Sequence, residues 1–381
     1  METFDGTMRS QASQRAQQFG GFVRQYTAGL NTRELRRLFD DDAANAYAVL
    51  TREMDLKPEP KGRLRRLLFR ARLIFLGLSY KLSPPRRLLF AAAIVCALLG
   101  LLSFHYEGGA RRVSVDFSPL NYLASIGALV FLLALELVDR IRVRDELEVA
   151  RELQSELLPH RVPDLPGYGF AHSYRTANEV GGDYYDFTAL PDGRLALMVG
   201  DASGHGMAAG LVMAIANATL ETALDLDPSP ERVLALLNRT LCRTGTKRTF
   251  MSVFYALLDP PSGRLDYVCA GHPYPLLRRA GSAVEELGSG GLPLGIREPL
   301  PQAVQSTVLA PGDLLVLYTD GLAEATDPTG AEAFGYDRLA KLVAAGGPPQ
   351  AVHDRILAAF DAHVGAEPLR DDLTLVVVAR T

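Results

Sequence analysis

Four aspartates in separate short motifs of the C-terminal part of the chain carry its strongest chemical signal. The motifs are Gly181-Gly182-Asp183-Tyr184-Tyr185-Asp186, Gly200-Asp201-Ala202-Ser203-Gly204-His205-Gly206, Tyr318-Thr319-Asp320-Gly321 and Arg370-Asp371-Asp372-Leu373-Thr374. Most of these aspartates directly follow or precede an apolar run that predicts a β-strand, and strand ends can bring distant residues together. Hard carboxylate oxygens suit Mg²⁺ or Mn²⁺ better than Zn²⁺. A pair of such ions is a common device for hydrolysing phosphate esters.

With these motifs, residues 147–381 resemble the PPM-type, metal-dependent protein serine/threonine phosphatases of the bacterial stage II sporulation protein E (SpoIIE) branch. The landmarks occur in the family's order along the chain. Besides the four motifs above they are Ala150-Arg151-Glu152-Leu153-Gln154 through Leu157-Leu158-Pro159, Ala270-Gly271-His272-Pro273, Pro293-Leu294-Gly295, and Leu322 with Glu324. Residues 1–135 show no such resemblance.

The resemblance implies a site with two or more Mn²⁺ or Mg²⁺ ions. Matched residue by residue, the metal ligands are Asp183, Asp201, Asp320 and Asp371. Asp201 would bridge two ions, and the backbone carbonyl of Ala202 would be a further ligand. The implied reaction is direct attack of activated water on phosphorus, with no covalent phospho-enzyme.

Two further residues have open alternatives. His205 is either a general acid or a structural residue of its loop, since the histidine of eukaryotic-type members lies nearer the bridging aspartate. Arg175 lies upstream of Asp183, roughly where related phosphatases place a phosphate-binding arginine. Asp186 and Asp372 are candidates for holding the ligands in place, and His272 is expected to bond within a turn.

The N-terminal half has the pattern of a membrane anchor. Between Lys61 and Arg87 there are nine Lys or Arg residues and no acidic residue, and apolar runs follow at Leu88–Phe104 and Leu120–Leu135. With a few flanking residues each run reaches the roughly 20 residues that span a bilayer. Basic flanks favour cytoplasmic ends, with residues 105–118 outside. The alternative is a pair of buried helices in a soluble domain.

The predicted organisation therefore has five parts. Residues 1–60 form a polar helical segment, and residues 61–87 a basic amphipathic helix on anionic membrane lipid, or else a solvated helix. Residues 88–138 form a transmembrane hairpin of a multi-pass protein in the inner (cytoplasmic) membrane. Residues 139–160 form a linker helix. Residues 161–381 form a cytoplasmic phosphatase domain.

The linker is expected to continue the second membrane helix without a break, because no proline occurs from Leu120 to Leu158. Val143, Leu147, Ala150 and Leu157 fall near heptad spacing, with Gln154 in the seam. That spacing predicts a parallel coiled coil and a homodimer. A helix packed on its own domain is the alternative.

Adjacent strands and adjacent helices in the last part of the chain predict an α+β fold with antiparallel sheets. Strands are predicted at 195–199, 251–258, 265–270, 314–318 and 373–379, and helices at 208–224, 230–242, 336–345 and 349–363. The resemblance implies an α-β-β-α sandwich with the metals at one end between the sheets.

The predicted function is a membrane-anchored protein serine/threonine phosphatase. The resemblance implies a phosphorylated regulatory protein of the STAS (anti-anti-sigma) type as substrate. The alternatives are a catalytically inactive docking module of the same fold, and another metal-dependent phosphohydrolase. The net charge of −4 gives no basic excess that would suggest a nucleic-acid partner. The three cysteines are widely spaced and are interpreted as free thiols.

Overall fold

A computed structural model describes residues 62–101, 117–159, 161–244, 249–281 and 284–381. The predicted helical segment 1–60 and most of the predicted external loop lie outside these residues. The chain divides into two compact units, Met1–Asp139 and Arg140–Thr381. Each unit is described by itself below.

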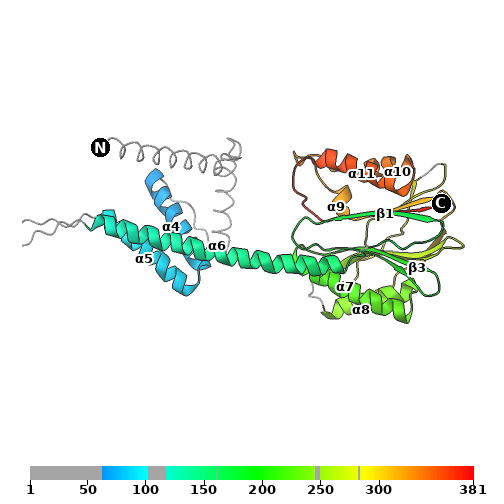
Figure 1. Cartoon of the computed structure of the whole chain (residues 1–381), viewed down its shortest axis with the longest axis horizontal. Helices are drawn as coiled ribbons and strands as arrows, with labels where there is room; N and C mark the ends of the chain where they lie inside the picture. The colour runs from blue at the N-terminus through cyan, green and yellow to red at the C-terminus, as the bar shows by residue number, and fades with distance from the viewer. Residues whose placement is uncertain (1–61, 102–116, 160, 245–248, 282–283) are drawn as a thin grey trace, which may run out of the picture. The chain divides into compact units, whose positions relative to one another are not determined.

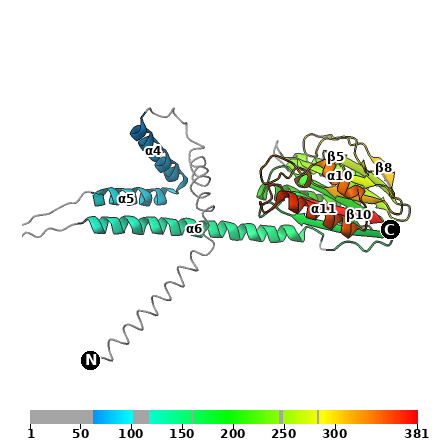
Figure 2. The same cartoon turned by 90° about the horizontal axis from the view of Figure 1, so that it is seen from above.

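The first unit contains an antiparallel helical hairpin (Figures 1 and 2). Helix α5 spans Pro84–Leu101, and helix α6 begins at Ser118 and runs to Glu156. At one end of the hairpin Arg86 donates a hydrogen bond to Asp139 at 2.6 Å. At the other end a Cβ on Gly100 would lie 2.9 Å from the Tyr122 ring. Glycine at position 100 therefore lets the two helices approach closely.

Three helices of the described residues are long and apolar enough to cross a membrane. Only 11% of the apolar window is buried in α5 and in α6, whereas 44% is buried in α7 (Met207–Leu226). Helix α7 packs in the core of the second unit, and this packing explains why it is apolar without a membrane. The remaining two helices are the ones predicted as the hairpin.

Helix α4, Arg63–Lys81, precedes the hairpin and is rich in arginine. Its Phe75 ring stacks on Phe90 of α5 with centroids 5.4 Å apart. Several of its other apolar side chains are exposed, among them Leu64 and Leu68. The helix thus carries both basic and apolar surface, as the sequence predicted.

The second unit is built on two five-stranded sheets in which every pairing is antiparallel. The first sheet has the order β1-β10-β9-β6-β7, with bounds Tyr168–Arg175, Leu373–Arg380, Leu314–Tyr318, Leu276–Arg278 and Val284–Glu286. The second has the order β2-β3-β4-β5-β8, with bounds Asp183–Ala189, Leu195–Ala202, Met251–Asp259, Arg264–Ala270 and Gln305–Val308.

Helices cover the outer face of each sheet (Figure 1). Helices α7 and α8 (Pro230–Thr244) lie on the side of β3, and α10 (Tyr336–Ala344) and α11 (Pro349–Val364) lie on the side of β1. The short helix α9, Asp320–Ala323, follows β9 directly. The α+β class and the α-β-β-α layering are therefore confirmed.

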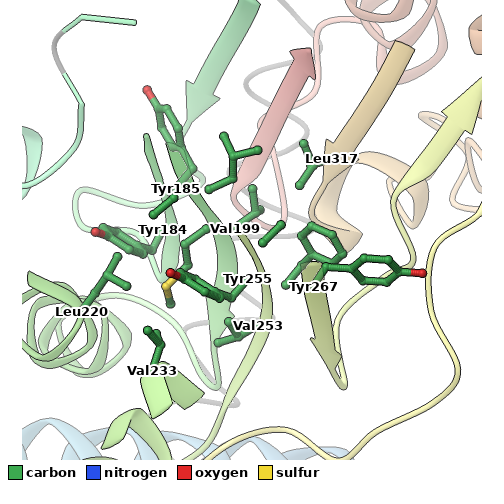
Figure 3. Packing of buried hydrophobic residues seen from close by; sticks show 14 of the residues in the cluster. Tyr184, Tyr185, Val199, Leu220, Val233, Val253, Tyr255, Tyr267 and Leu317 are labelled. Carbon is green, nitrogen blue, oxygen red and sulfur yellow. The ribbon is translucent and has the colours of Figure 1, made fainter. Parts of the chain in front are cut away.

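The strands at the centre of the sandwich are buried on both faces. All five residues of β9 are buried. Leu315 and Leu317 belong to the core between the sheets, whereas Val316 packs with the residues of α10 and α11. Because successive side chains point to opposite faces, a strand covered on both sides is apolar throughout. Figure 3 shows the buried cluster that contains Leu317, which extends to Leu220 of α7 and Val233 of α8.

The predicted strands and helices of this unit are present, with ends shifted by a few residues. Strands β1, β2, β6, β7 and β8 were not predicted. Strands β1 and β2 carry polar residues in their sequences, YGFAHSYR and DYYDFTA, so neither gives a clear apolar run. Strands β6, β7 and β8 are only three or four residues long. Such short segments carry too few residues for a pattern to stand out.

Helix α6 is continuous over 39 residues, as predicted from the absence of proline. The placement of Gln154 in a dimer seam is wrong. Its side chain is 5% exposed and bonds both backbone groups of Gly181, with Nε2 donating to the carbonyl at 2.6 Å and Oε1 accepting from the amide at 2.9 Å. The end of the helix is thus packed on its own domain, which was the alternative interpretation.

Candidate active site

Asp183 and Asp201 are placed opposite each other by the pairing of β2 with β3. They are direct partners in the antiparallel ladder. Residues in such a pair point to the same face of the sheet, so their carboxylates are neighbours. Gly182 makes room beside them, since a Cβ there would lie 2.9 Å from the Ala202 carbonyl oxygen and 3.5 Å from Asp201 Oδ1. The pairing therefore brings three predicted metal ligands together.

Asp320 and Asp371 are brought together by the pairing of β9 with β10. Asp320 comes two residues after Tyr318, the last residue of β9, and Asp371 comes two residues before Leu373, the first of β10. Gly321 packs directly on the backbone of Asp372, and a Cβ at position 321 would overlap that residue's carbonyl oxygen. Only glycine allows this approach between the two segments.

Two threonine hydroxyls join the two pairs of aspartates across the sandwich. Thr319 Oγ1 and Thr374 Oγ1 each donate to Asp183 Oδ2 at 2.7 Å. Thr319 Oγ1 in turn accepts from the Thr374 amide at 3.0 Å. Asp183 is 1% exposed, so these bonds fix one carboxylate oxygen of a buried group. The ends of both sheets thereby meet at one point.

Asp372 holds the loop that leads into Asp183. Its Oδ1 accepts from the Ala177 amide at 2.8 Å, and its Oδ2 accepts from the Gly182 amide at 2.6 Å. The adjacent Asp371 is exposed, with Oδ1 accepting from the Asp372 amide. Asp372 therefore has a structural role in this loop, whereas Asp371 faces solvent.

The electrostatics of the cluster favour a cation. Burial, followed by the charges of Asp320, Asp371 and Asp372, raises the pKa of Asp201 to about 8. The pKa of Asp183 is raised well above its usual range by burial and by Asp201, and the two threonine bonds oppose this rise. No lysine or arginine of the part of the chain that the structure describes contributes to either pKa shift. Carboxylates grouped without a basic partner are the usual signature of a cation site.

The donor set fits Mn²⁺ or Mg²⁺ in chemical type, since it consists of carboxylate oxygens and one backbone carbonyl. Among the described residues no three acidic, histidine or cysteine side chains already lie close enough to enclose an ion. Binding would therefore require the carboxylates to reorient toward a shared ion. Asp371, exposed two residues before β10, has the most freedom to do so.

His205 is exposed in a loop whose flanking Gly204 and Gly206 have φ of 100° and 64°. Those angles favour glycine on both sides of the histidine. Burial raises the pKa of Asp371, and His205 in this loop lies near enough to that carboxyl to oppose part of the rise. Ser203 in the same loop accepts a hydrogen bond from the Phe250 amide at 2.9 Å, which fixes the turn.

Arg175 is turned toward helix α11. Its guanidinium pairs with Asp361 at 2.5 Å and 3.3 Å. The phosphate-binding role of Arg175 stays a prediction. Asp186 accepts from Tyr184 Oη and from the Phe187 amide, so it stabilises β2 and its neighbours.

Sequence reasoning missed the hydroxyls of Thr319 and Thr374 and the amide of Gln154. The two threonines stood inside the quoted motifs, next to Asp320 and three residues after Asp371. Their role depends on the antiparallel register, which the motifs do not reveal. His272 was expected to bond within a turn, but its Nδ1 bonds Ser252 Oγ of strand β4 at 2.9 Å.

Comparison with known proteins agrees with this geometry. The sequence model of the family described as Stage II sporulation protein E (SpoIIE) matches residues 191–381, which is half of the chain. The chain belongs to the SpoIIE family. The SpoIIE match includes Asp201, Asp320 and Asp371, whereas Asp183 lies just before it.

Among curated proteins, the SpoIIE-family chain is 26% identical to "Phosphoserine phosphatase RsbU" of Bacillus subtilis over 245 residues, covering 62% of this chain and 71% of RsbU. It is 27% identical to "Protein IcfG" of Synechocystis sp. over 300 residues, covering 71% of this chain and 47% of IcfG. The match thus spans about half the length of IcfG. Among solved structures, the SiaA-PP2C domain of Pseudomonas aeruginosa aligns with a TM-score of 0.57 at 22% identity, covering 64% of this chain and 98% of that domain. This similarity establishes the PP2C-type fold of the second unit.

Proposed function

We propose that this SpoIIE-family chain is a metal-dependent protein serine/threonine phosphatase. The observation that carries the proposal is the meeting of Asp183, Asp201, Asp320 and Asp371 at one end of the sandwich, where the two sheets are joined by the threonine bonds. RsbU, a relative named as a phosphoserine phosphatase, supports the reaction class.

The four aspartates and the Ala202 carbonyl would hold two or more Mn²⁺ or Mg²⁺ ions, which supply activated water and neutralise charge on the phosphoryl group. The protein's own part is to fix the ligands. Thr319 and Thr374 orient Asp183, and Asp372 anchors the loop before it. His205 is exposed beside Asp371, a position from which it would protonate the departing serine or threonine oxygen.

The substrate class is tested by measuring phosphate release with Mn²⁺ from a phosphoserine protein, a nucleotide and a phosphorylated lipid. The proposal expects turnover of the phosphoprotein to exceed that of the other two. Preferred hydrolysis of nucleotide or lipid would instead support another phosphohydrolase of the same fold. Bound Mn²⁺ without turnover of any substrate would support an inactive docking module. A phosphorylated STAS-type regulator is the specific substrate that the family resemblance suggests.

We further propose that α5 and the first part of α6 cross the inner membrane and leave the phosphatase domain in the cytoplasm. The support is the exposed apolar surface of both helices together with the basic residues that precede α5. The Arg86–Asp139 ion pair would then lie at the cytoplasmic end of the hairpin. Basic helix α4 would rest on anionic lipid headgroups.

Dimerisation through α6 remains part of the proposal, with a seam that excludes Gln154. Val143, Val149 and Leu153 are all exposed on this helix. Their exposure supports a second helix packing against the stretch before Gln154. Sedimentation of residues 140–381 would detect the dimer, and a monomer at every concentration would contradict it.

A further inference from the structure

A hollow lies in the phosphatase unit beside the candidate active site. Its volume is about 400 Å³, and its walls include Tyr274, Tyr318, Tyr336, Glu286 and His272. Tyr318 is the last residue of β9 and stands two positions before Asp320. The hollow therefore adjoins the segment that carries one of the proposed metal ligands.

Aromatic rings form much of this hollow. The rings of Tyr318 and Tyr336 have centroids 6.2 Å apart. Tyr318 is fixed, because its hydroxyl donates to the Tyr274 carbonyl at 3.0 Å and its side chain is almost fully buried. Tyr336, at the start of α10, is 45% exposed and presents an accessible ring. Gly288 packs against the Tyr274 ring, where any side chain would collide.

The charge at the hollow is negative. Glu286 is exposed at the end of β7, and its carboxylate makes no hydrogen bond or ion pair among the described residues. Its neighbour Glu285, by contrast, is paired with Arg279 at 2.5 Å. Among the described residues, no lysine or arginine lines the hollow. Burial and then the charges of Glu324, Asp320 and Glu286 raise the pKa of Tyr336, so all three carboxylates lie near this residue.

The buried histidine of the hollow does not offset this charge. His272 bonds Ser252 through Nδ1, and burial lowers its pKa to about 3. It is therefore neutral at physiological pH. Negative carboxylates beside an exposed aromatic ring, here Tyr336, are surroundings that bind a Lys or Arg side chain, by charge pairing and by cation–π contact.

We propose that this hollow binds a lysine or arginine side chain of the phosphoprotein substrate, near the phosphorylated residue in the substrate's sequence. The inference rests on the proposed function, because the basic side chain is expected to arrive together with a phosphoserine or phosphothreonine. It assigns a substrate preference to Glu286 and Tyr336. Neither residue is among the proposed metal ligands.

The test uses the full chain and two phosphoserine peptides that are identical except that one carries lysine or arginine, and the other alanine, at the positions flanking the phosphoserine. Binding is measured by fluorescence anisotropy in the presence of chelator, so that it does not depend on catalysis. Turnover of the peptides and of p-nitrophenyl phosphate is then measured with Mn²⁺. The variants are Glu286→Gln and Tyr336→Leu, and the matched control is Glu285→Gln on the same strand.

The wild-type chain is expected to bind the basic peptide roughly tenfold more tightly than the alanine peptide, with a similar advantage in kcat/KM. Glu286→Gln and Tyr336→Leu should each remove most of that advantage, while turnover of p-nitrophenyl phosphate and of the alanine peptide stays within about twofold. Equal binding of the two peptides by the wild-type chain would overturn the inference. An equal loss in Glu285→Gln, or a parallel loss on p-nitrophenyl phosphate, would overturn it as well.

The outcomes separate this inference from the proposed function. Failure of the wild-type chain to hydrolyse any substrate with Mn²⁺ would count against the phosphatase, whereas the anisotropy comparison would still decide the hollow's preference. Normal turnover with no preference for the basic peptide would leave the phosphatase standing and overturn only the inference.

Discussion

At the scale of single residues, the hydroxyl groups of Thr319 and Thr374 orient one of the proposed metal ligands, Asp183. Asp183 is the first residue of β2 and would be poorly placed without the two hydroxyls that bond its Oδ2. Partners that hold a metal ligand commonly affect metal affinity almost as strongly as the ligand itself. Thr319 and Thr374 should therefore influence the site without touching an ion.

The substitution Thr374→Val tests this role while keeping the shape of a buried strand residue. Loss of one hydroxyl leaves Asp183 with a single donor, so the Mn²⁺ concentration for half-maximal activity should rise about tenfold. Stability should fall by about 1 kcal/mol, as measured by urea unfolding. Thr222→Val, whose hydroxyl bonds only the Ala218 carbonyl of its own helix, is the control. An unchanged Mn²⁺ requirement in Thr374→Val would contradict the positioning role.

The sequence predicted the four candidate ligands but not how they meet. Asp183 and Asp201 are close because β2 and β3 pair in one particular register, and a slip of one residue would turn the carboxylates to opposite faces. The register is set by contacts throughout the core. Likewise, the structural role of Asp372 arises from its position beside Gly182, 190 residues away in the sequence.

At the scale of elements, the clearest result is the attachment of α6 to the phosphatase domain. Gln154 satisfies both the amide and the carbonyl of Gly181, which is two residues before Asp183. Leu158 adds to the attachment by joining the buried apolar cluster that also contains Leu315 and Leu317. A change in the position of the end of α6 would therefore move Gly181 and the loop that leads to Asp183.

Replacing Gln154 with leucine is expected to destabilise the domain. The Gly181 amide and carbonyl would lose their partners while remaining buried, at a cost of about 1–3 kcal/mol. In thermal unfolding of residues 140–381 this corresponds to a drop of roughly 2–4 °C per kcal/mol. Glu148→Leu, an exposed site on the same helix, should leave the midpoint unchanged. Equal midpoints for the wild type and Gln154→Leu would show that the helix end is not anchored there.

Strands and helices were predictable wherever their pattern followed from burial. Strand β9 is a continuous apolar run because both of its faces are covered, and helix α8 carries the apolar stripe of a helix with one buried face. Strand β2 was not predicted because it lacks a clear apolar run. Its Asp183 belongs to the candidate site, and its Tyr184 accepts a hydrogen bond from Asn217 of α7. Functional positions depart from the local pattern, which is where prediction from sequence is expected to fail.

At the scale of the whole molecule, an apolar helical hairpin precedes the phosphatase domain in the chain, and our proposal puts the hairpin in the membrane and the domain in the cytoplasm. Cysteine labelling of intact cells tests the arrangement. Phe117→Cys, just before α6, should react with a membrane-impermeant maleimide from outside, and Arg144→Cys, farther along the same helix, should react only after lysis. The expected contrast follows from the approximately 30 Å hydrocarbon layer that α6 would cross between them. Equal labelling of the two sites in intact cells would contradict the predicted topology.

The most direct test of the central claim is the metal dependence of phosphate release by residues 140–381 from p-nitrophenyl phosphate and from a phosphoserine protein. We predict turnover with Mn²⁺, none with chelator, and a loss of about 100-fold or more in Asp201→Asn. Asp192→Asn, the same change in the exposed turn between β2 and β3, should retain full activity. Turnover that persists in chelator, or that is unaffected by Asp201→Asn, would contradict a metal-dependent phosphatase centred on the four aspartates.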